Sequence, residues 1–291
     1  MELVSNYMEN AELRHKLNAL TRKTFGFDFE KWVTGGYFEG DYIPYSWMED
    51  GKIVSNVSAN RMCFLQKGKV KNYIQIGTVM TDPDYRNRGL AKRLMEYVVK
   101  AYEGSCDGIY LFGDLSALDF YRKTGFQEGL QYQYVLKKPL PGDPGKKAFS
   151  PVDQTDPGMK RRYMQAVRRS AANASLEQMN KFGLQMFYTA NMRDVYYAED
   201  LDCFAVMDME GDTLTLQSLI CKDRVPMEEI LVRLGTPYRH LKLGFSPLGE
   251  DAHLFQGEPY DGGEDYRLFY RGKTLDSIAK DKLFFPLMSH A

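Results

Sequence analysis

Apolar and polar positions divide the chain into short helices and strands that alternate along its whole length. Residues 10–22 carry leucines at helical spacing, which predicts an amphipathic helix, and residues 28–33 predict a second, shorter helix. Two turn pairs, Asp50-Gly51 and Lys67-Gly68, then separate β-rich runs. Two helices followed by an antiparallel meander are therefore expected at the start of the chain.

A strand, a basic turn and a helix follow between residues 74 and 100. The apolar run ends at Asp82-Pro83, and an amphipathic helix is predicted to begin at Gly89. The first turn of a helix presents unpaired backbone N–H groups and the positive end of the helix dipole, so a strand leading into it forms an anion site, usually for phosphate. Gly89 lacks a Cβ and allows a ligand to approach the backbone closely.

A second strand and helix come next. Residues 108–112 predict a short buried strand, residues 116–123 a helix, and residues 131–137 a further strand. Gly125 is suited to the left-handed position that often ends a helix. The expected order is two helices, a meander, then strand, turn, helix, strand, helix and strand.

These segments resemble the GNAT N-acetyltransferase family. Residues 82–91, DPDYRNRGLA, match its pattern D-P-x-Y-R-x-R-G-x-A, and residues 114–126, DLSALDFYRKTGF, resemble its segment N-x-x-A-x-x-F-Y-x-x-x-G-F. The resemblance covers about residues 1–138, and the segment of residues 25–59 is similar to one bacterial group of the family. It implies an α/β (α+β) GNAT fold: a central mixed, mostly antiparallel sheet flanked by helices.

The resemblance also implies acetyl-coenzyme A as co-substrate, and no metal. In the family, the loop amides hold the pyrophosphate and the edge of the preceding strand pairs with the pantetheine arm. Carried over by position, the coenzyme-binding residues are Val79, Met80, Thr81, Arg86, Asn87, Arg88, Gly89, Leu90, Ala91 and Asp114. Asp114 replaces the family's asparagine, which puts that amide's contact in doubt.

Tyr121 is the candidate catalytic residue. In the family, the tyrosine at this position lies near the coenzyme sulfur and often acts as general acid, and a phenol of pKa about 10 protonates a thiolate readily. The alternative is a structural tyrosine packed beside Phe120. Histone-type members use a glutamate as base on the strand before the loop, but that position is Gln75 here.

Composition is that of an ordinary globular protein. The chain has 291 residues, 26% charged and 44% hydrophobic, with a net charge of −1, so no strong field attracts nucleic acid or membrane. Four scattered cysteines without a C-x-x-C pattern predict reduced thiols rather than a zinc site or a disulfide framework. With neither a secretion signal nor an apolar run of membrane-spanning length, a cytoplasmic location is expected.

The length favours two domains. We expect a catalytic GNAT domain over residues 1–138, a Pro- and Gly-rich linker over 139–158, and a smaller, degenerate GNAT-like domain over 159–291. A helix is expected over residues 160–183. The strand, turn, helix, strand order then recurs without R-x-x-G-x-A, so no coenzyme is expected in this half. It is expected to cover the acceptor site or to form a homodimer contact.

Two segments near the end of the sequence carry candidate site residues. His290 follows Phe284 and Phe285, whose burial is expected to bring the chain end toward the site; in one tandem branch of the family a terminal carboxylate acts as base. Residues 257–266, GEPYDGGEDY, are acidic, and either select a cationic amine or form an ordinary surface loop.

Three functions remain open from the sequence. The first is N-acetyl transfer from acetyl-coenzyme A to a small-molecule or peptide amine, by direct transfer in a ternary complex. The second is a non-catalytic acetyl-coenzyme A sensor or partner protein. The third, RNA binding, rests on a basic helix around Arg161 and is weakened by the neutral net charge. We expect the first, without a nucleic-acid or membrane partner.

Overall fold

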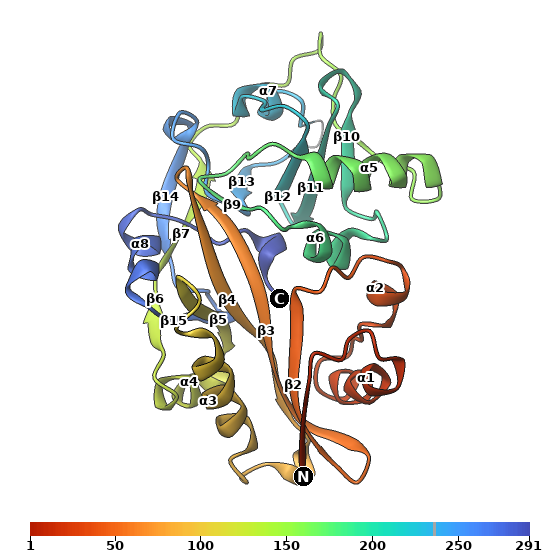
Figure 1. Cartoon of the computed structure of the whole chain (residues 1–291). Coiled ribbons are helices and arrows are strands. Elements are labelled where there is room, and N and C mark those ends of the chain that lie inside the picture. Colours follow the sequence, from red (N-terminus) through yellow and green to blue (C-terminus); the bar gives the residue numbers. More distant parts are fainter. Residues whose placement is uncertain (235–236) are drawn as a thin grey trace.

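The computed structural model describes residues 1–234 and 237–291, which form two mixed sheets flanked by helices (Figure 1). The fold predicted from the sequence is confirmed: each sheet is mostly antiparallel and contains one parallel pair of strands. A helix follows the first strand of each parallel pair, so the strand, turn, helix, strand order does recur in the second half.

The first sheet carries the segments that resemble the GNAT family. Its strands, in spatial order, are β1 (Glu2–Ser5), β2 (Tyr42–Glu49), β3 (Lys52–Gln66), β4 (Lys69–Thr81), β5 (Gly108–Asp114), β15 (Tyr266–Arg271) and β6 (Gln127–Gly129), with β9 (Leu176–Gln178) paired to one end of β3. The β4–β5 pair is parallel, and the other pairs are antiparallel.

Helices cover both faces of this sheet. The helix α3 (Leu90–Tyr102) buries Leu94, Met95 and Val98 against one face, where they meet Ile74 and Ile76 of β4. On the other face, α1 (Ala11–Phe25) and α2 (Glu30–Thr34) pack on β2 and on the end of β4. The short helix α4 (Leu118–Lys123) follows β5. The helices α3 and α4 thus follow β4 and β5 in the order expected from the sequence.

The second sheet belongs mainly to the second half. Its strands, in spatial order, are β14 (Phe255–Tyr260), β7 (Gln131–Leu136), β13 (His240–Leu243), β12 (Thr213–Cys221), β11 (Cys203–Glu210), β10 (Val195–Ala198) and β8 (Ser150–Pro151). Its helices are α5 (Pro157–Arg169), α6 (Phe182–Thr189) and α7 (Met227–Leu231), and α8 (Asp276–Lys280) follows β15. The helix expected over residues 160–183 is thus two helices with β9 between them.

The two sheets exchange a strand, which the sequence did not indicate. β7, expected to close the first sheet, pairs with β13 and β14 in the second sheet. β15, expected in the second half, lies between β5 and β6 of the first sheet. Both strands are short and mix polar with apolar residues, and such runs do not specify which sheet edge they complete. The domain boundaries at residues 138 and 158 remain a prediction. The strand exchange crosses them, because β7 comes before residue 138 and β15 after residue 158, yet each strand pairs in the sheet of the other half.

The expected linker is partly ordered against the second sheet. Residues 150 and 151 form β8, which pairs with β10. The Phe149 side chain is buried, and its backbone N–H donates to the Arg233 carbonyl. Its Pro and Gly content predicted an extended segment, but the apolar residues near its end fix it to the sheet.

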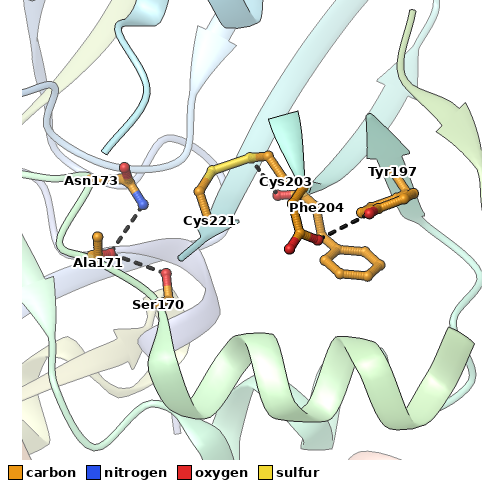
Figure 2. The surroundings of a disulfide bond; sticks show 8 residues. Ser170, Ala171, Asn173, Tyr197, Cys203, Phe204 and Cys221 are labelled. Carbon is orange, nitrogen blue, oxygen red and sulfur yellow. Dashed lines mark hydrogen bonds between the residues drawn. A yellow bond between two sulfur atoms is a disulfide. The ribbon is translucent and has the colours of Figure 1, made fainter. Parts of the chain in front are cut away.

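The cysteine prediction was wrong for one pair. Cys203 and Cys221 are partners in the antiparallel β11–β12 ladder and form a disulfide (Figure 2). The sequence separates them by 18 residues, so only the strand register brings their Cα atoms to 4.4 Å. Cys63 and Cys106 are free thiols. Within the described residues, the structure contains no helix long and apolar enough to cross a membrane.

Candidate functional site

The first sheet opens where its two parallel strands separate. β4 and β5 pair from Tyr73 and Gly108 as far as Ile76 and Leu111, and the pairing ends there. Beyond this point, the end of β4 still pairs with β3, whereas the end of β5 pairs with β15. The two strands therefore splay, and their facing edges become the walls of a cleft.

A bulge on β4 lies at the mouth of this cleft. The register to β3 shifts between Asn56 and Ser58, and Thr78 has a φ of 41°, a strained conformation for a β-branched residue. The Thr78 hydroxyl lies 2.6 Å from the Tyr42 hydroxyl and donates to Ser58 at 2.8 Å. The Asn56 amide donates to the Thr78 carbonyl at 2.9 Å. This buried polar network holds the strained residue in place.

A cavity of about 600 Å³ fills the cleft. β4 contributes Gly77, Thr78 and Val79 to its wall, and β5 contributes Phe112 and Asp114. Its size is in the range of sites for small ligands. Of the predicted site residues, the structure brings Val79, Asp114 and Tyr121 together in this cavity.

The predicted anion loop lies at the start of α3. The helix begins at Leu90, Gly89 before it has a φ of 71°, and no side chain caps its first N–H groups. Residues 86–89 are exposed, and the Arg88 side chain lies over the Tyr85 ring and donates to the Asp84 carbonyl at 2.9 Å. The first turn contains no acidic residue. The loop therefore presents free N–H groups and positive charge to solvent.

Three predicted coenzyme residues also have structural roles. The Met80 side chain is buried in the core beside α1, and its carbonyl accepts a hydrogen bond from Ser55 at 3.1 Å. The Thr81 hydroxyl lies 2.9 Å from the same Ser55 hydroxyl. Leu90 is buried under Trp47, whose indole N–H donates to the Leu90 carbonyl at 3.3 Å.

Tyr121 lies in α4 with its ring inside the cavity wall. Only 6% of the residue is exposed, and its ring packs against Phe269 of β15 at 5.4 Å between centroids. Gly113 of β5 lies directly beneath: a Cβ there would meet the Tyr121 ring at 2.6 Å. Burial, with a smaller contribution from the Asp114 charge, raises the pKa of Tyr121 to about 12. The phenol therefore stays protonated at neutral pH.

Asp114 is already engaged by the chain. Its carboxylate accepts from the Ser116 backbone N–H at 2.7 Å and from the Ser116 hydroxyl, which lowers its pKa. These contacts cap the turn that leads into α4. The carboxylate is nevertheless at the cavity wall and brings a negative charge there.

The last residues of the sequence enter the same cavity. His290 and Ala291 line it. In Figure 1 the C label lies beside the first sheet. With its amide oriented to match its neighbours, Gln75 donates to the Ser289 carbonyl at 2.8 Å and accepts from the Ala291 N–H at 2.9 Å. Tyr188 donates to the His290 carbonyl at 2.6 Å. Gln75 thus anchors the segment of residues 289–291 in the site.

His290 is an uncharged part of this wall. Its ring stacks on Phe112, 3.7 Å between centroids, and burial lowers the pKa of the imidazole to about 3. Tyr266, from the acidic segment of residues 257–266, packs edge-on against both rings. The acidic segment therefore reaches the back of the site through an aromatic side chain.

Sequence reasoning missed the aromatic wall opposite the sheet. Phe25, Phe27, Phe29 and Trp32 line the cavity from the α1–α2 region, and Phe187 and Tyr188 line it from α6. The alternation F-G-F-D-F-E-K-W over residues 25–32 was visible in the sequence. The contribution of α6 to this wall was not visible in the sequence, because it depends on how the second half of the chain packs against the first. Among the described residues, no group of His, Cys, Asp or Glu side chains could hold a metal ion.

Comparison with known proteins finds a domain family that matches the part of the chain around the cleft. The GNAT acetyltransferase domain matches residues 45–128, which hold the cleft and α3. "GCN5-related N-acetyltransferase 2, chloroplastic" from Arabidopsis thaliana is 36% identical over 67 residues, which are 22% of this chain and 26% of the plant protein. The alignment thus spans about a quarter of that protein.

Solved structures match the chain over almost its whole length. A GCN5-related N-acetyltransferase from Kribbella flavida covers 95% of this chain and 72% of its own, with 17% identity and a TM-score of 0.55. Eis1 from Mycobacterium abscessus covers 92% and 73%, with 14% identity and a TM-score of 0.55. A probable N-acyltransferase from Enterococcus faecalis covers 95% and 73%, with 16% identity and a TM-score of 0.52. At these identities the likeness shows a shared fold, and within it residues 45–128 match the GNAT acetyltransferase domain.

Proposed function

We propose that the protein transfers the acetyl group of acetyl-coenzyme A to a primary amine, directly and within a ternary complex. The observation that carries this proposal is the cleft between β4 and β5, which opens beyond Ile76 and Leu111 into a cavity of about 600 Å³. The uncapped start of α3 follows the same β4 strand. A thioester arm and an anionic pyrophosphate thus have adjoining sites on one strand–loop–helix unit.

The coenzyme is proposed to lie along this unit. The pyrophosphate would accept from the free N–H groups of residues 86–91, with charge from the exposed Arg86 and Arg88. The pantetheine arm would follow the β4 edge at Val79, Met80 and Thr81. Only Val79 of these three lines the cavity, which would place the thioester near that residue.

The reaction requires one bond to form and one to break. The amine nitrogen attacks the thioester carbonyl carbon, the C–N bond forms, and the C–S bond breaks as the thiolate leaves. Tyr121 is proposed to protonate this thiolate, because its pKa of about 12 keeps the phenol protonated at neutral pH. Once the C–N bond has formed, the nitrogen releases its surplus proton to water, and water returns a proton to the Tyr121 phenolate.

The amine is proposed to lose its proton to water before attack. Gln75 stands where histone-type members have a glutamate, and its amide is occupied by Ser289 and Ala291. With a pKa of about 3, His290 is a poor proton acceptor at neutral pH. The rate should therefore follow the fraction of amine that is already deprotonated.

The second half is proposed to hold no coenzyme and to cover the acceptor side of the cavity. The rings of Phe187 and Tyr188 from α6 close that side, and the Trp32 indole N–H donates to the Gly183 carbonyl of α6 at 2.8 Å. The second domain predicted from the sequence would then be a structural part of the acceptor site.

Tyr121→Phe tests the chemical role. Thiol release from acetyl-coenzyme A with an amine should fall at least about tenfold in kcat, as expected for loss of a general acid. Coenzyme affinity should stay within about twofold. Tyr163→Phe is the matched control: Tyr163 is equally buried but bonds to Thr189 and Gln185 in the second half, so it should lower stability without lowering kcat.

The pH profile extends the same test. Because Tyr121 is protonated below about pH 11, the wild-type kcat/KM should rise with pH toward the pKa of the amine, without a fall from loss of the acid. Full activity of the phenylalanine variant would remove Tyr121 from the mechanism. Coenzyme binding without turnover of any amine would favour a non-catalytic coenzyme-binding protein instead.

A further inference from the structure

The wall of the cavity opposite the sheet is aromatic to an unusual degree. Nine of the nineteen residues that line the whole cavity are Phe, Tyr or Trp, and six of these nine come from the α1–α2 region and α6, whereas Phe, Tyr and Trp make up 13% of the chain. The rings of the α1–α2 region contact those of α6: Phe27 and Trp32 each meet Phe187 at 5.7 Å between centroids. This wall is a preformed apolar surface.

The polar tips of this wall are already bonded within the protein. The Trp32 indole N–H donates to the Gly183 carbonyl, the Tyr42 hydroxyl pairs with Thr78, and the Tyr188 hydroxyl donates to His290. What these side chains offer to a ligand is therefore the faces and edges of their rings. A hydroxyl-rich acceptor would lose its hydrogen bonds to water here without replacing them.

Side-chain charge in the cavity is sparse and lies at one end. Asp114 supplies the one acidic side chain among the lining residues, and it lies on β5 beside Tyr121, near the proposed thioester position. His290 is uncharged at neutral pH. The site can thus orient one amine at the sheet, but it lacks a set of acidic side chains that would hold several ammonium groups.

The rim of the cavity is apolar as well. Phe25 is 47% exposed and Tyr188 is 41% exposed, so both rings face solvent at the entrance. Exposed large apolar side chains grouped at a cavity mark a surface that meets an apolar ligand. An acceptor would therefore contact rings from the entrance down to the sheet.

On these grounds, and resting on the proposed acetyl transfer, we propose that the acceptor is a monoamine with an aromatic or aliphatic body. The body would lie among the rings of the α1–α2 region and α6, and the amine would point at the sheet between Val79 and Tyr121. Polyamines and amino sugars would be poor acceptors, because their additional ammonium and hydroxyl groups would be buried without partners.

The first arm of the test compares acceptors. Thiol release from acetyl-coenzyme A is measured with 2-phenylethylamine and hexylamine against 2-aminoethanol and spermidine, at equal concentrations of deprotonated amine. We expect kcat/KM for 2-phenylethylamine to exceed that for 2-aminoethanol at least about tenfold. Spermidine or 2-aminoethanol matching 2-phenylethylamine would overturn the acceptor class while leaving acetyl transfer intact.

The second arm changes the rim. Phe25→Glu adds a carboxylate at the entrance and should lower kcat/KM for 2-phenylethylamine about fivefold or more while raising that for spermidine. Val70→Glu is the matched control, since Val70 is 61% exposed and lies at the opposite end of β4 from the cleft. Equal effects of both variants would overturn the assignment of the rim.

Two further results would count against the proposal. If hexanoyl-coenzyme A with 2-aminoethanol is preferred over acetyl-coenzyme A with 2-phenylethylamine, the apolar wall holds the acyl chain rather than the acceptor. If the protein binds acetyl-coenzyme A but releases no thiol with any of the four amines, the proposed acetyl transfer itself fails, and the acceptor class with it.

Discussion

Each sheet of this protein contains a parallel strand pair that splays, but only the first splay opens into a cavity of ligand size. Beyond Ile76 and Leu111 of the first pair lies a cavity of about 600 Å³. Beyond Leu216 and Leu243 of the second pair, the lining leaves about 30 Å³. The same local architecture thus leads to a site in one half and to a filled core in the other.

The chain itself fills the second splay. The Leu287 N–H donates to the Gly244 carbonyl at 2.8 Å, and Pro286, Met288 and Ser289 line the small space that remains. The same segment then continues into the first cleft as His290 and Ala291. One stretch of chain therefore closes one cleft and lines the other.

The starts of the helices α7 and α3 also differ, because the first is occupied by carboxylates of the chain and the second is free. At α7, the Asp251 carboxylate accepts from the Met227 N–H at 3.2 Å, and Glu228 and Glu229 occupy the first turn. An internal carboxylate thus takes the place of an external anion there. At α3, no side chain caps the start. A strand followed by a helix is therefore insufficient for anion binding, because the helix start must also be left free.

The largest expected effect comes from blocking the free helix start. Gly89→Trp should lower coenzyme affinity at least about a hundredfold, because an indole would occupy the pyrophosphate path. Gly211→Trp is the matched control: Gly211 also has a positive φ and open space around it, but lies in the β11–β12 turn of the second sheet. Calorimetric titration with coenzyme A measures the affinity of both variants. An equal loss of affinity in the two would contradict the assignment of residues 86–91 to pyrophosphate binding.

A smaller effect is expected from Gln75→Glu. A carboxylate cannot donate to the Ser289 carbonyl, so residues 289–291 should shift and kcat/KM should fall several-fold. If position 75 instead needs a base, the same variant should be faster than wild type. The direction of the change therefore decides between an anchoring and a catalytic role. Gln75→Met, which removes both hydrogen bonds without adding charge, should also be slower.

The smallest effect on catalysis is expected from the disulfide. Replacing Cys203 and Cys221 together by Ser should destabilise the second sheet by about 2–3 kcal/mol, as expected for a short closed loop. Coenzyme affinity and kcat should remain within about twofold, because β11 and β12 do not line the cleft between β4 and β5. Thermal unfolding and thiol release measure the two quantities. A large loss of kcat in soluble variant protein would show that the two sheets are coupled.

The sequence predicted what depends on neighbouring residues. Two continuous motifs contain Gly89, which precedes an amphipathic run, and Tyr121, which precedes Gly125. At both motifs the structure has the expected strand, loop and helix. The exchange of β7 and β15 between sheets was not predicted, because pairing partners more than 100 residues apart leave no local pattern. The cysteine pair was missed for the same reason, since strand register decides it.

The acceptor side shows the same limit within the site. The aromatic run from Phe25 to Trp32 is visible in the sequence, but its function depends on Phe187 and Tyr188, which α6 brings from the second half. Gln75 is another case. Its position in the motif suggested a missing base, whereas its contacts with residues near the end of the chain show an anchor.

The position of β15 has a consequence for how the protein is made. β15 separates β5 from β6, so the first sheet cannot be completed until residue 271 has left the ribosome. Until then the edge of β5, with Ile109 and Leu111, remains unpaired and exposed to other chains. The nascent first half must therefore wait for β15 before its sheet is complete.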